Sequence, residues 1–489
     1  MSPRPKDSPK DSTTGERATG TPQTAAAARA ATTRRRAGRA VGCAVSLAVA
    51  LTAAAVVVGD LRDGRNPAPV TAAPYGASGA GAGAGAGSGS GSGTGSGTAA
   101  VGEDLGAGLR SLRAHLRSQP RDHQGWATLG LALVEQARTT GDPSRYPPAQ
   151  RALARSLELR PGNDQALAGQ AALAAARHDF AGALAYADRA LARNPYSERA
   201  LCSRIDALVE LGRYAAAARA ADTADERRPG IPVFTRYAYV RELRGDVRAA
   251  RRVLERARSA ARTPGDTAYV ATQLGRLAWS GGDHAAALRH YARALAADDG
   301  YLPALEGRAL ARAAGGDRAG AIGDLERVVA RAPLPGPLVA LGELYEERGE
   351  RARAREQYAL VDAWTALARA GGVEAGPDTA LAAADHGDRR AALRTARGEW
   401  SRRRTVHTAD ALGWALYVNG RPAQALRYAR RATATGYRDA AFQYHRGMIE
   451  RAAGDPATGR ALLRAALDLN PGFSPAGARA ARQALAGTR

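Results

Sequence analysis

The sequence predicts an all-α protein: a right-handed α-solenoid of about ten helix–turn–helix units, preceded by one transmembrane helix and a disordered linker. Three observations predict this organisation. A turn motif recurs about every 34 residues over 101–489, residues 40–59 contain no charge, and a stretch of alternating small residues separates the two regions. A chain of 489 residues is too long for one ordinary core, and stacked repeats remove the need for one.

Residues 1–39 are rich in Pro, Ser, Thr and Arg and contain almost no large apolar side chains. They cannot bury enough surface to offset the entropy lost on ordering, so we expect a disordered basic tail. Residues 1–40 carry nine basic and three acidic side chains, a net charge of +6, whereas residues 60–65 balance at zero. Because positive flanks stay on the cytoplasmic side, the tail is expected in the cytoplasm and the chain after residue 60 outside it.

Residues 40–59, AVGCAVSLAVALTAAAVVVG, are predicted to form a signal-anchor helix in the cell membrane. Twenty residues at about 1.5 Å each span roughly 30 Å, the hydrocarbon thickness of a bilayer. A cleaved secretory signal and a buried helix remain as alternatives, the former because the run is rich in alanine. Cys43 opens the apolar run instead of following it, which disfavours a lipid-modified cysteine.

Residues 60–100 are predicted to be a flexible linker, because Gly alternates with Ala, Ser or Thr from Gly79 to Gly97. No Lys-Ser or Lys-Thr pair follows the glycines, so the pattern is not a phosphate-binding loop. A linker of 41 Gly-rich residues has a root-mean-square reach of about 35 Å. It would hold the following domain near the bilayer without pressing it against the surface.

The repeat over residues 101–489 is a small turn, often Gly-Asp, placed between two helices of Ala-rich sequence. Each first helix has a large apolar residue beside a small one, and each second helix has Ala where the two helices meet. These positions share one face of a 3.6-residue period. The spacings between successive turns are 34, 33, 37, 34, 33, 38, 33 and 34, and the turn residues are His178, Gly212, Gly245, Gly282, Gly316, Gly349, Gly387, Gly420 and Gly454.

This pattern resembles the tetratricopeptide repeat, a 34-residue helix–turn–helix unit, over nearly all of residues 101–489. The first full unit has the Trp-x-x-Leu-Gly of that family at Trp126, Leu129 and Gly130, followed by about seven extra residues in its turn. The preceding segment, with Leu109, Leu112, Leu116 and Pro120, is similar to a lone second helix that caps the array. The unit at 376–404 matches least well. The order of segments is similar to that of bacterial membrane-anchored repeat proteins.

No motif in the sequence supports catalysis or a cofactor. HExxH, GxSxG and a P-loop are absent, the eight histidines are scattered, and two cysteines exclude a multi-cysteine metal site. His284 and His290 are six residues apart and therefore point to different faces of a helix. Cys202 lies among apolar neighbours and is interpreted as a small buried side chain. The sequence predicts a non-enzymatic protein with no metal or cofactor and no small-molecule substrate.

In the tetratricopeptide family the first helices line the concave wall, and aromatic and arginine side chains are typical anchors for peptides. The resemblance places near that wall Tyr239, Arg276, Trp279, Glu343, Trp414, Tyr417, Tyr444 and Met448. The alternative is that these side chains fill gaps between units. Members that bind chaperone tails use Asn and Lys on successive first helices. The equivalent positions have no Asn and the array has no Lys, so no chaperone-tail binding is expected.

We therefore expect a membrane-anchored adaptor or scaffold that binds a protein or peptide partner, with acidic partners favoured by 59 basic against 42 acidic residues in 101–489. One alternative is an assembly factor for an envelope transporter, secretion or cell-wall complex. Binding of nucleic acid or another anionic polymer is less favoured, because the arginines are mixed with acidic residues in most units. A cytoplasmic regulatory array would require the opposite membrane orientation.

Overall fold

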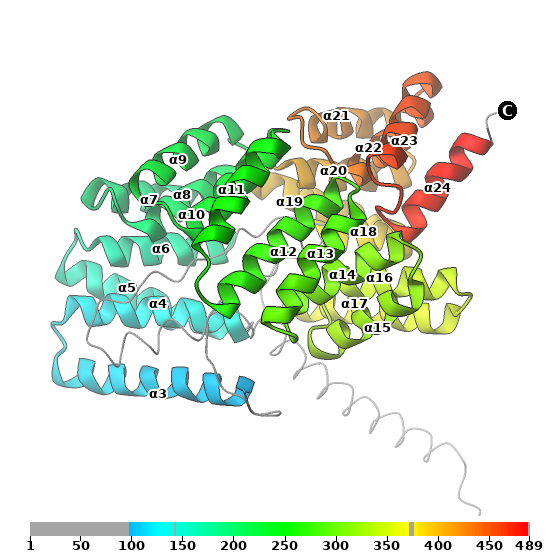
Figure 1. Cartoon of the computed structure of the whole chain (residues 1–489). Coiled ribbons are helices and arrows are strands. Elements are labelled where there is room, and N and C mark those ends of the chain that lie inside the picture. The colour runs from blue at the N-terminus through cyan, green and yellow to red at the C-terminus, as the bar shows by residue number, and fades with distance from the viewer. Residues whose placement is uncertain (1–96, 141–142, 371–375, 488–489) are drawn as a thin grey trace, which may run out of the picture. The chain divides into compact units, whose positions relative to one another are not determined.

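The computed structural model describes residues 97–140, 143–370 and 376–487, all of which belong to one compact unit of the chain. They form α-helices and one short 3-10 helix, with no strand among them. A single helix, α3 (Gly97–Ser118), precedes ten consecutive helix pairs, and a single helix, α24 (Pro475–Ala486), follows them (Figure 1). The solenoid of about ten units predicted from the sequence is thus confirmed.

The first five pairs are α4 (His123–Thr140) with α5 (Tyr146–Leu159), α6 (Asp164–Ala176) with α7 (Phe180–Arg193), α8 (Glu198–Glu210) with α9 (Tyr214–Arg227), α10 (Ile231–Leu243) with α11 (Val247–Ala260), and α12 (Pro264–Ser280) with α13 (His284–Ala297). The 3-10 helix η1 (Pro143–Arg145) lies inside the first pair.

The last five pairs are α14 (Leu302–Ala314) with α15 (Arg318–Arg331), α16 (Pro335–Glu347) with α17 (Arg351–Ala370), α18 (Pro377–His386) with α19 (Arg389–Arg402), α20 (Val406–Val418) with α21 (Pro422–Ala432), and α22 (Ala440–Ala452) with α23 (Pro456–Leu469).

The expected tail (1–39), membrane helix (40–59) and most of the linker (60–100) lie outside the described residues. Within the described part, no helix combines the length and the apolar character needed to cross a membrane. The first described helix begins at Gly97, just inside the range expected as linker.

The turn inside each pair explains the recurring glycine. Eight of the nine turn positions have positive φ, from +60° at His178 to +102° at Gly454. Glycine adopts this left-handed conformation without a Cβ penalty, and it ends the first helix. The exception is Gly387, with φ −140°, in the unit that matches the repeat least well.

The residue after the turn glycine starts the second helix. In six pairs an aspartate side chain accepts a hydrogen bond from a backbone N–H in the first turn of that helix, which satisfies a donor with no partner inside the helix. These N-cap residues are Asp179, Asp246, Asp283, Asp317, Asp388 and Asp455. The Gly-Asp dipeptide therefore stops one helix and starts the next.

Small residues let the two helices of a pair approach closely. A Cβ added at Gly413 would lie 3.2 Å from the backbone nitrogen of Ala429 in the partner helix. At Gly275 and Gly342 the space is instead filled by the rings of Tyr291 and Tyr358. The core consequently consists largely of buried alanine and leucine, which accounts for the low aromatic content.

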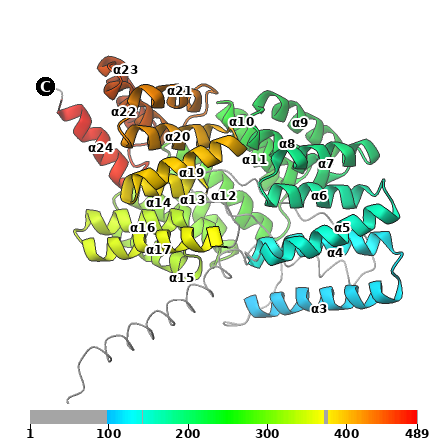
Figure 2. The same cartoon turned by 180° about the vertical axis from the view of Figure 1, so that it is seen from behind.

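Helix pairs far apart in the sequence also contact one another, as Figure 2 shows for α19 and α20 beside α8 to α11. A Cβ added at Gly212 would collide with the Arg404 carbonyl oxygen, and one at Gly245 would lie 2.6 Å from the Gly436 carbonyl oxygen. The Tyr214 hydroxyl accepts a hydrogen bond of 2.8 Å from the Val406 N–H. Successive turns of the superhelix therefore touch through these glycine turns, a contact that the repeat pattern does not predict.

A buried ion pair joins the same two regions. The Arg403 guanidinium lies 3.2 Å from a Glu210 carboxylate oxygen and 2.7 Å from one of Glu399. All three side chains are almost fully buried. Burial raises the pKa of Glu210 to about 7, and the nearby arginine opposes that rise.

Candidate functional site

The eight residues predicted for the concave wall lie on five first helices, α10, α12, α16, α20 and α22. Five of them are buried: Tyr239, Trp279, Glu343, Trp414 and Tyr444. Arg276, Tyr417 and Met448 are partly exposed. Residues from successive first helices do lie close together, but most of their contacts are with other side chains of the same chain.

Polar contacts join one first helix to the next along this wall. Arg276 of α12 pairs with Glu242 of α10, with its Nη2 2.5 Å from a carboxylate oxygen. The Trp414 indole N–H donates to Asp385 at 2.6 Å, and Glu343 lies 3.3 Å from His386. The positive charge of Arg276 is thus neutralised by an internal carboxylate.

Several of the predicted residues pack against one another and against His445 around the Trp414 ring. The Trp414 ring stacks on His445 at 4.2 Å and on Tyr417 at 4.9 Å, and it lies 5.5 Å from Tyr444. Met448 packs at the edge of the same apolar cluster. Partner binding at these eight residues stays a prediction, and any partner would meet only their exposed edges.

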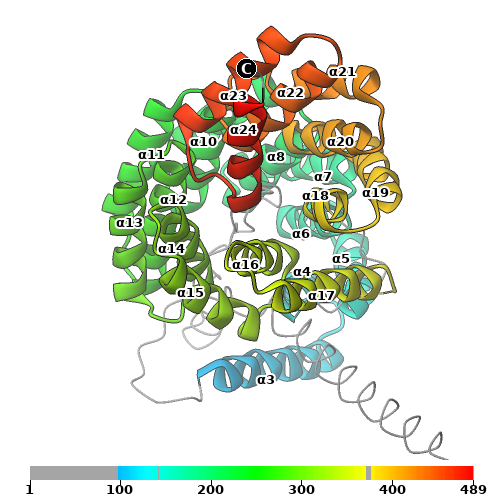
Figure 3. The same cartoon turned by 90° about the vertical axis from the view of Figure 1, so that its right-hand side faces the viewer.

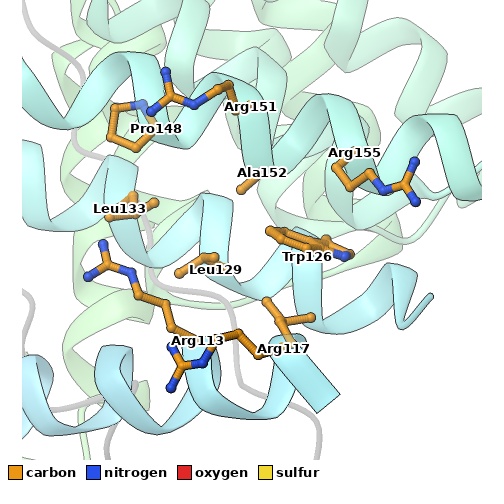
Figure 4. Close-up of a pocket in the computed structure, with 10 residues that line it drawn as sticks. Arg113, Arg117, Trp126, Leu129, Leu133, Pro148, Arg151, Ala152 and Arg155 are labelled. Carbon is orange, nitrogen blue, oxygen red and sulfur yellow. The ribbon is translucent and has the colours of Figure 1, made fainter. Parts of the chain in front are cut away.

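A different site lies at the N-terminal end of the solenoid, between α3, α4 and α5. A cavity of about 500 Å³ opens there, and Figure 4 shows its lining. Its floor is apolar and includes Leu116, Trp126, Leu129, Leu133 and Ala152. Trp126, Leu129 and Leu133 are spaced three and four residues apart, so they form one face of α4.

Four exposed arginines form the rim of this cavity. Arg113 and Arg117 stand one helical turn apart on α3, and Arg151 and Arg155 stand one turn apart on α5. The two pairs lie on opposite sides of Trp126 and Leu129 in Figure 4. Arg155 has an exposed ion pair with Glu158 at 3.0 Å. Within the described residues the other three have no acidic partner. We call this site the arginine-rimmed pocket.

The position of the pocket follows from two departures from a regular repeat. Among the described residues, helix α3 has no partner helix of its own, and the first pair contains extra turn residues that include η1 and precede Pro148, which lines the pocket. The Trp126 ring is held in place by its indole N–H, which donates to the Pro120 carbonyl at 3.0 Å.

Sequence reasoning assigned Trp126 and Leu129 only to the repeat motif and missed the pocket. The available signal was two arginine pairs of spacing four, Arg113 with Arg117 and Arg151 with Arg155, on either side of a helix that contains tryptophan. Spacing alone does not show that the two pairs face each other.

The remaining candidate groups show no reactive arrangement among the described residues. No set of three or more His, Cys, Asp and Glu side chains in that part of the chain is placed to hold a metal ion. Cys202 is buried, and burial raises the pKa of its thiol to about 12. A thiol with so high a pKa is a poor nucleophile at neutral pH.

Comparison with known proteins gives matches in architecture only. No protein-family model matches the chain, and no curated protein sequence matches it. Similar solved structures include a human IFIT1 dimer with m7Gppp-AAAA, with 15% identity over 69% of this chain and 78% of that one and a TM-score of 0.44.

Two bacterial proteins are also similar in architecture. The tetratricopeptide protein TTC0263 of Thermus thermophilus has 24% identity over 38% of this chain and 98% of that one, with a TM-score of 0.34. A tetratricopeptide protein of Parabacteroides merdae has 19% identity over 53% and 86%, with a TM-score of 0.31. At TM-scores below 0.5, nothing about ligands follows from these structures. The helix pairs, their spacing of about 34 residues and their left-handed turns give the described residues the architecture of a tetratricopeptide-repeat solenoid.

Proposed function

We propose that this chain is a non-enzymatic adaptor that docks an acidic segment of a protein partner in the arginine-rimmed pocket. The observation that carries the proposal is an apolar floor between two arginine pairs, three members of which have no acidic partner in the described part of the chain. An apolar side chain of the partner would enter over Trp126, and carboxylates on either side of it would meet the arginines.

Both parts of this contact have a physical basis. Burying an aromatic or aliphatic anchor in a pocket gives much of the energy at typical docking sites. Arginine binds carboxylates through two parallel N–H donors, which lysine cannot do. Four exposed guanidinium groups around one pocket also repel one another, and an acidic ligand would relieve that repulsion.

The test is fluorescence anisotropy with a labelled synthetic heptapeptide that has a central leucine and three glutamates on each side. Its binding should be saturable and should weaken about tenfold or more when Arg113 and Arg151 are both changed to glutamine, as expected for loss of charge-assisted contacts. The matched control changes Arg248 and Arg252, an exposed pair of the same spacing on α11, to glutamine. Equal weakening in both variants would show nonspecific electrostatics and refute the proposal.

A second arm separates acidic protein from nucleic acid. A single-stranded RNA of equal net charge is added as a competitor at 0.15 M salt, where nonspecific phosphate contacts are weakened. We expect the peptide to remain bound. Pocket-dependent binding of the RNA with no binding of the peptide would replace the adaptor proposal with RNA binding.

We also propose that residues 40–59 anchor the adaptor in the cell membrane with the repeats outside the cytoplasm. The support is the uncharged run and the basic flank that precedes it. Protease added to intact spheroplasts should remove a tag placed after Arg489. Protection of the tag until lysis would place the repeats in the cytoplasm and contradict this orientation.

A further inference from the structure

The segment that follows α23 crosses to helix pairs far from it in the sequence. Residues 470–476 contact the turn between α12 and α13, the end of α14, the middle of α16 and the face of α22. Helix α24, which follows directly, packs on α16, α22 and α23. Figure 3 shows that α24 begins near α16 and runs away from it toward the C-terminus.

Asn470 makes the first set of contacts with both ends of its amide. Its Nδ2 donates to the Trp279 carbonyl oxygen at 2.9 Å, and its Oδ1 lies 2.9 Å from His284 Nε2. The side chain is 2% exposed. Since both partners lie about 190 residues earlier in the chain, the amide recognises a distant surface instead of closing a local turn alone.

Phe473 makes the apolar contact. Its ring lies 5.6 Å from that of Tyr444, and it packs against apolar clusters of both the α12–α14 region and the α18–α22 region. Gly472 fits directly against Ala314, because a Cβ added at Gly472 would collide with the Ala314 Cβ. The segment is therefore packed closely against both the α12–α14 region and the α18–α22 region.

Glu343 holds the start of α24. One of its carboxylate oxygens accepts hydrogen bonds from the Ser474 hydroxyl at 3.1 Å and from the Ala476 N–H at 3.3 Å. A carboxylate at a helix N-terminus is favoured by the unpaired N–H groups and by the helix dipole. This interaction joins α24 to α16 across 131 residues of sequence.

A similar turn elsewhere in the chain makes none of these contacts. The Asn-Pro turn at residues 194–197 has the same position after a second helix, but Asn194 bonds to Asp164 within its own helix pair, and its aromatic residue Tyr196 is 64% exposed. The turn at residues 194–197 therefore lacks the contacts with distant helix pairs that Asn470, Phe473 and Ser474 make.

We infer that residues 470–487 are a resident ligand of the inner wall and occupy a peptide-binding surface made by Trp279, His284, Glu343 and Tyr444. Three of these four residues are among those the sequence assigned to a partner. A partner for this surface would present the same chemistry: a side-chain amide, an aromatic ring three residues later, and then the first turn of a helix. Binding of such a segment requires release of the C-terminal helix, so the contact is autoinhibitory.

The experiment uses the chain ended after Leu469 and a fluorescent peptide of residues 470–487. The peptide should bind the shortened chain saturably and the full chain at least tenfold more weakly, because the full chain already carries the ligand. Changing Phe473 of the peptide to alanine should weaken binding about tenfold, as for a buried aromatic anchor. A control peptide of residues 194–211, which has the same length and also begins with Asn-Pro, should not bind.

Absence of saturable binding to a folded shortened chain would overturn the inference, and so would equal binding to both chains. A second measurement covers the case in which the shortened chain does not fold. In the full chain, Glu343→Gln should speed amide hydrogen exchange in α24 at least tenfold, whereas Glu356→Gln, at an exposed position on α17, should not. Unchanged exchange in the Glu343 variant would equally refute docking of the helix through that carboxylate. Neither result depends on the arginine-rimmed pocket.

Discussion

Replacing Gly245 by alanine tests whether successive turns of the superhelix touch in solution. The turn has φ +80°, and the new Cβ would lie 2.6 Å from the Gly436 carbonyl oxygen. Ordinary van der Waals contact begins near 3.4 Å, so the two turns would have to separate locally by about 0.8 Å. Gly349 is the matched control, because it also has φ +80° but has no atom within 4 Å of an added Cβ.

Two contributions to the loss of stability, backbone strain and steric overlap, differ between the variants. A left-handed residue with a Cβ costs about 1–2 kcal/mol, and both variants incur that cost. Overpacking a close contact adds about 1–3 kcal/mol, which only Gly245→Ala incurs. We therefore expect the free energy of unfolding to fall by about 2–5 kcal/mol in Gly245→Ala and by about 1–2 kcal/mol in Gly349→Ala.

The assay combines urea denaturation with hydrogen exchange measured by mass spectrometry, since a solenoid need not unfold in one step. In Gly245→Ala, exchange should rise around residue 436 as well as around residue 245. In Gly349→Ala, exchange should rise only near the substitution. Equal destabilisation in the two variants, with no change around residue 436, would refute contact between the superhelical turns.

Three further outcomes are expected. Arg403→Ala leaves the buried Glu210 carboxylate without its cationic partner, while Glu399 keeps its pair with Arg402, and it should destabilise the chain by about 3–5 kcal/mol in urea denaturation. Arg394→Ala breaks an exposed pair and should cost less than about 1 kcal/mol; similar costs would contradict the buried network. Burial, followed by the charge of Arg403, lowers the pKa of His407 to about 3 from 6.5. The stability that neutral His407 contributes is present above pH 6.5 and is lost as pH falls toward 3, so between pH 7.5 and 5 the wild type should lose about 2 kcal/mol relative to His407→Leu; parallel pH profiles would contradict its burial. Cys202 should react with iodoacetamide at pH 8 only in urea, as followed by peptide mass spectrometry, and rapid reaction of the folded chain would show that the thiol is accessible.

The repeat architecture could be predicted because each unit encodes it locally. A glycine at positive φ, an aspartate N-cap and an alanine at the helix contact are short-range requirements, and they recur often enough to be recognised without a structure. The lone helix before the first pair could be predicted for the same reason. Even the poorest unit was identifiable, and its turn at Gly387 does differ from the others.

The environment of the predicted groove residues could not be obtained in this way. Their positions on the first helices follow from the repeat register, but whether Trp414 or Glu343 faces a partner depends on what lies across the interior. The contacts that cover them come from His445, Ser474 and Asn470, which are 31 to 191 residues away in sequence. Periodicity describes neighbours in one unit and contains no information about such pairs.

The sequence by itself determined the helices of the described residues, their turns and the unit count, because these depend on local composition and spacing. The division of the preceding residues into tail, membrane segment and linker stays a prediction. Only the tertiary structure decided that successive turns of the superhelix touch, that the C-terminal segment occupies the inner wall, and that two arginine pairs face each other over Trp126. The physical reason is that small differences in packing angle accumulate along a solenoid. Which distant residues come into contact therefore depends on the packing angles of many successive helix pairs, and no single motif specifies it.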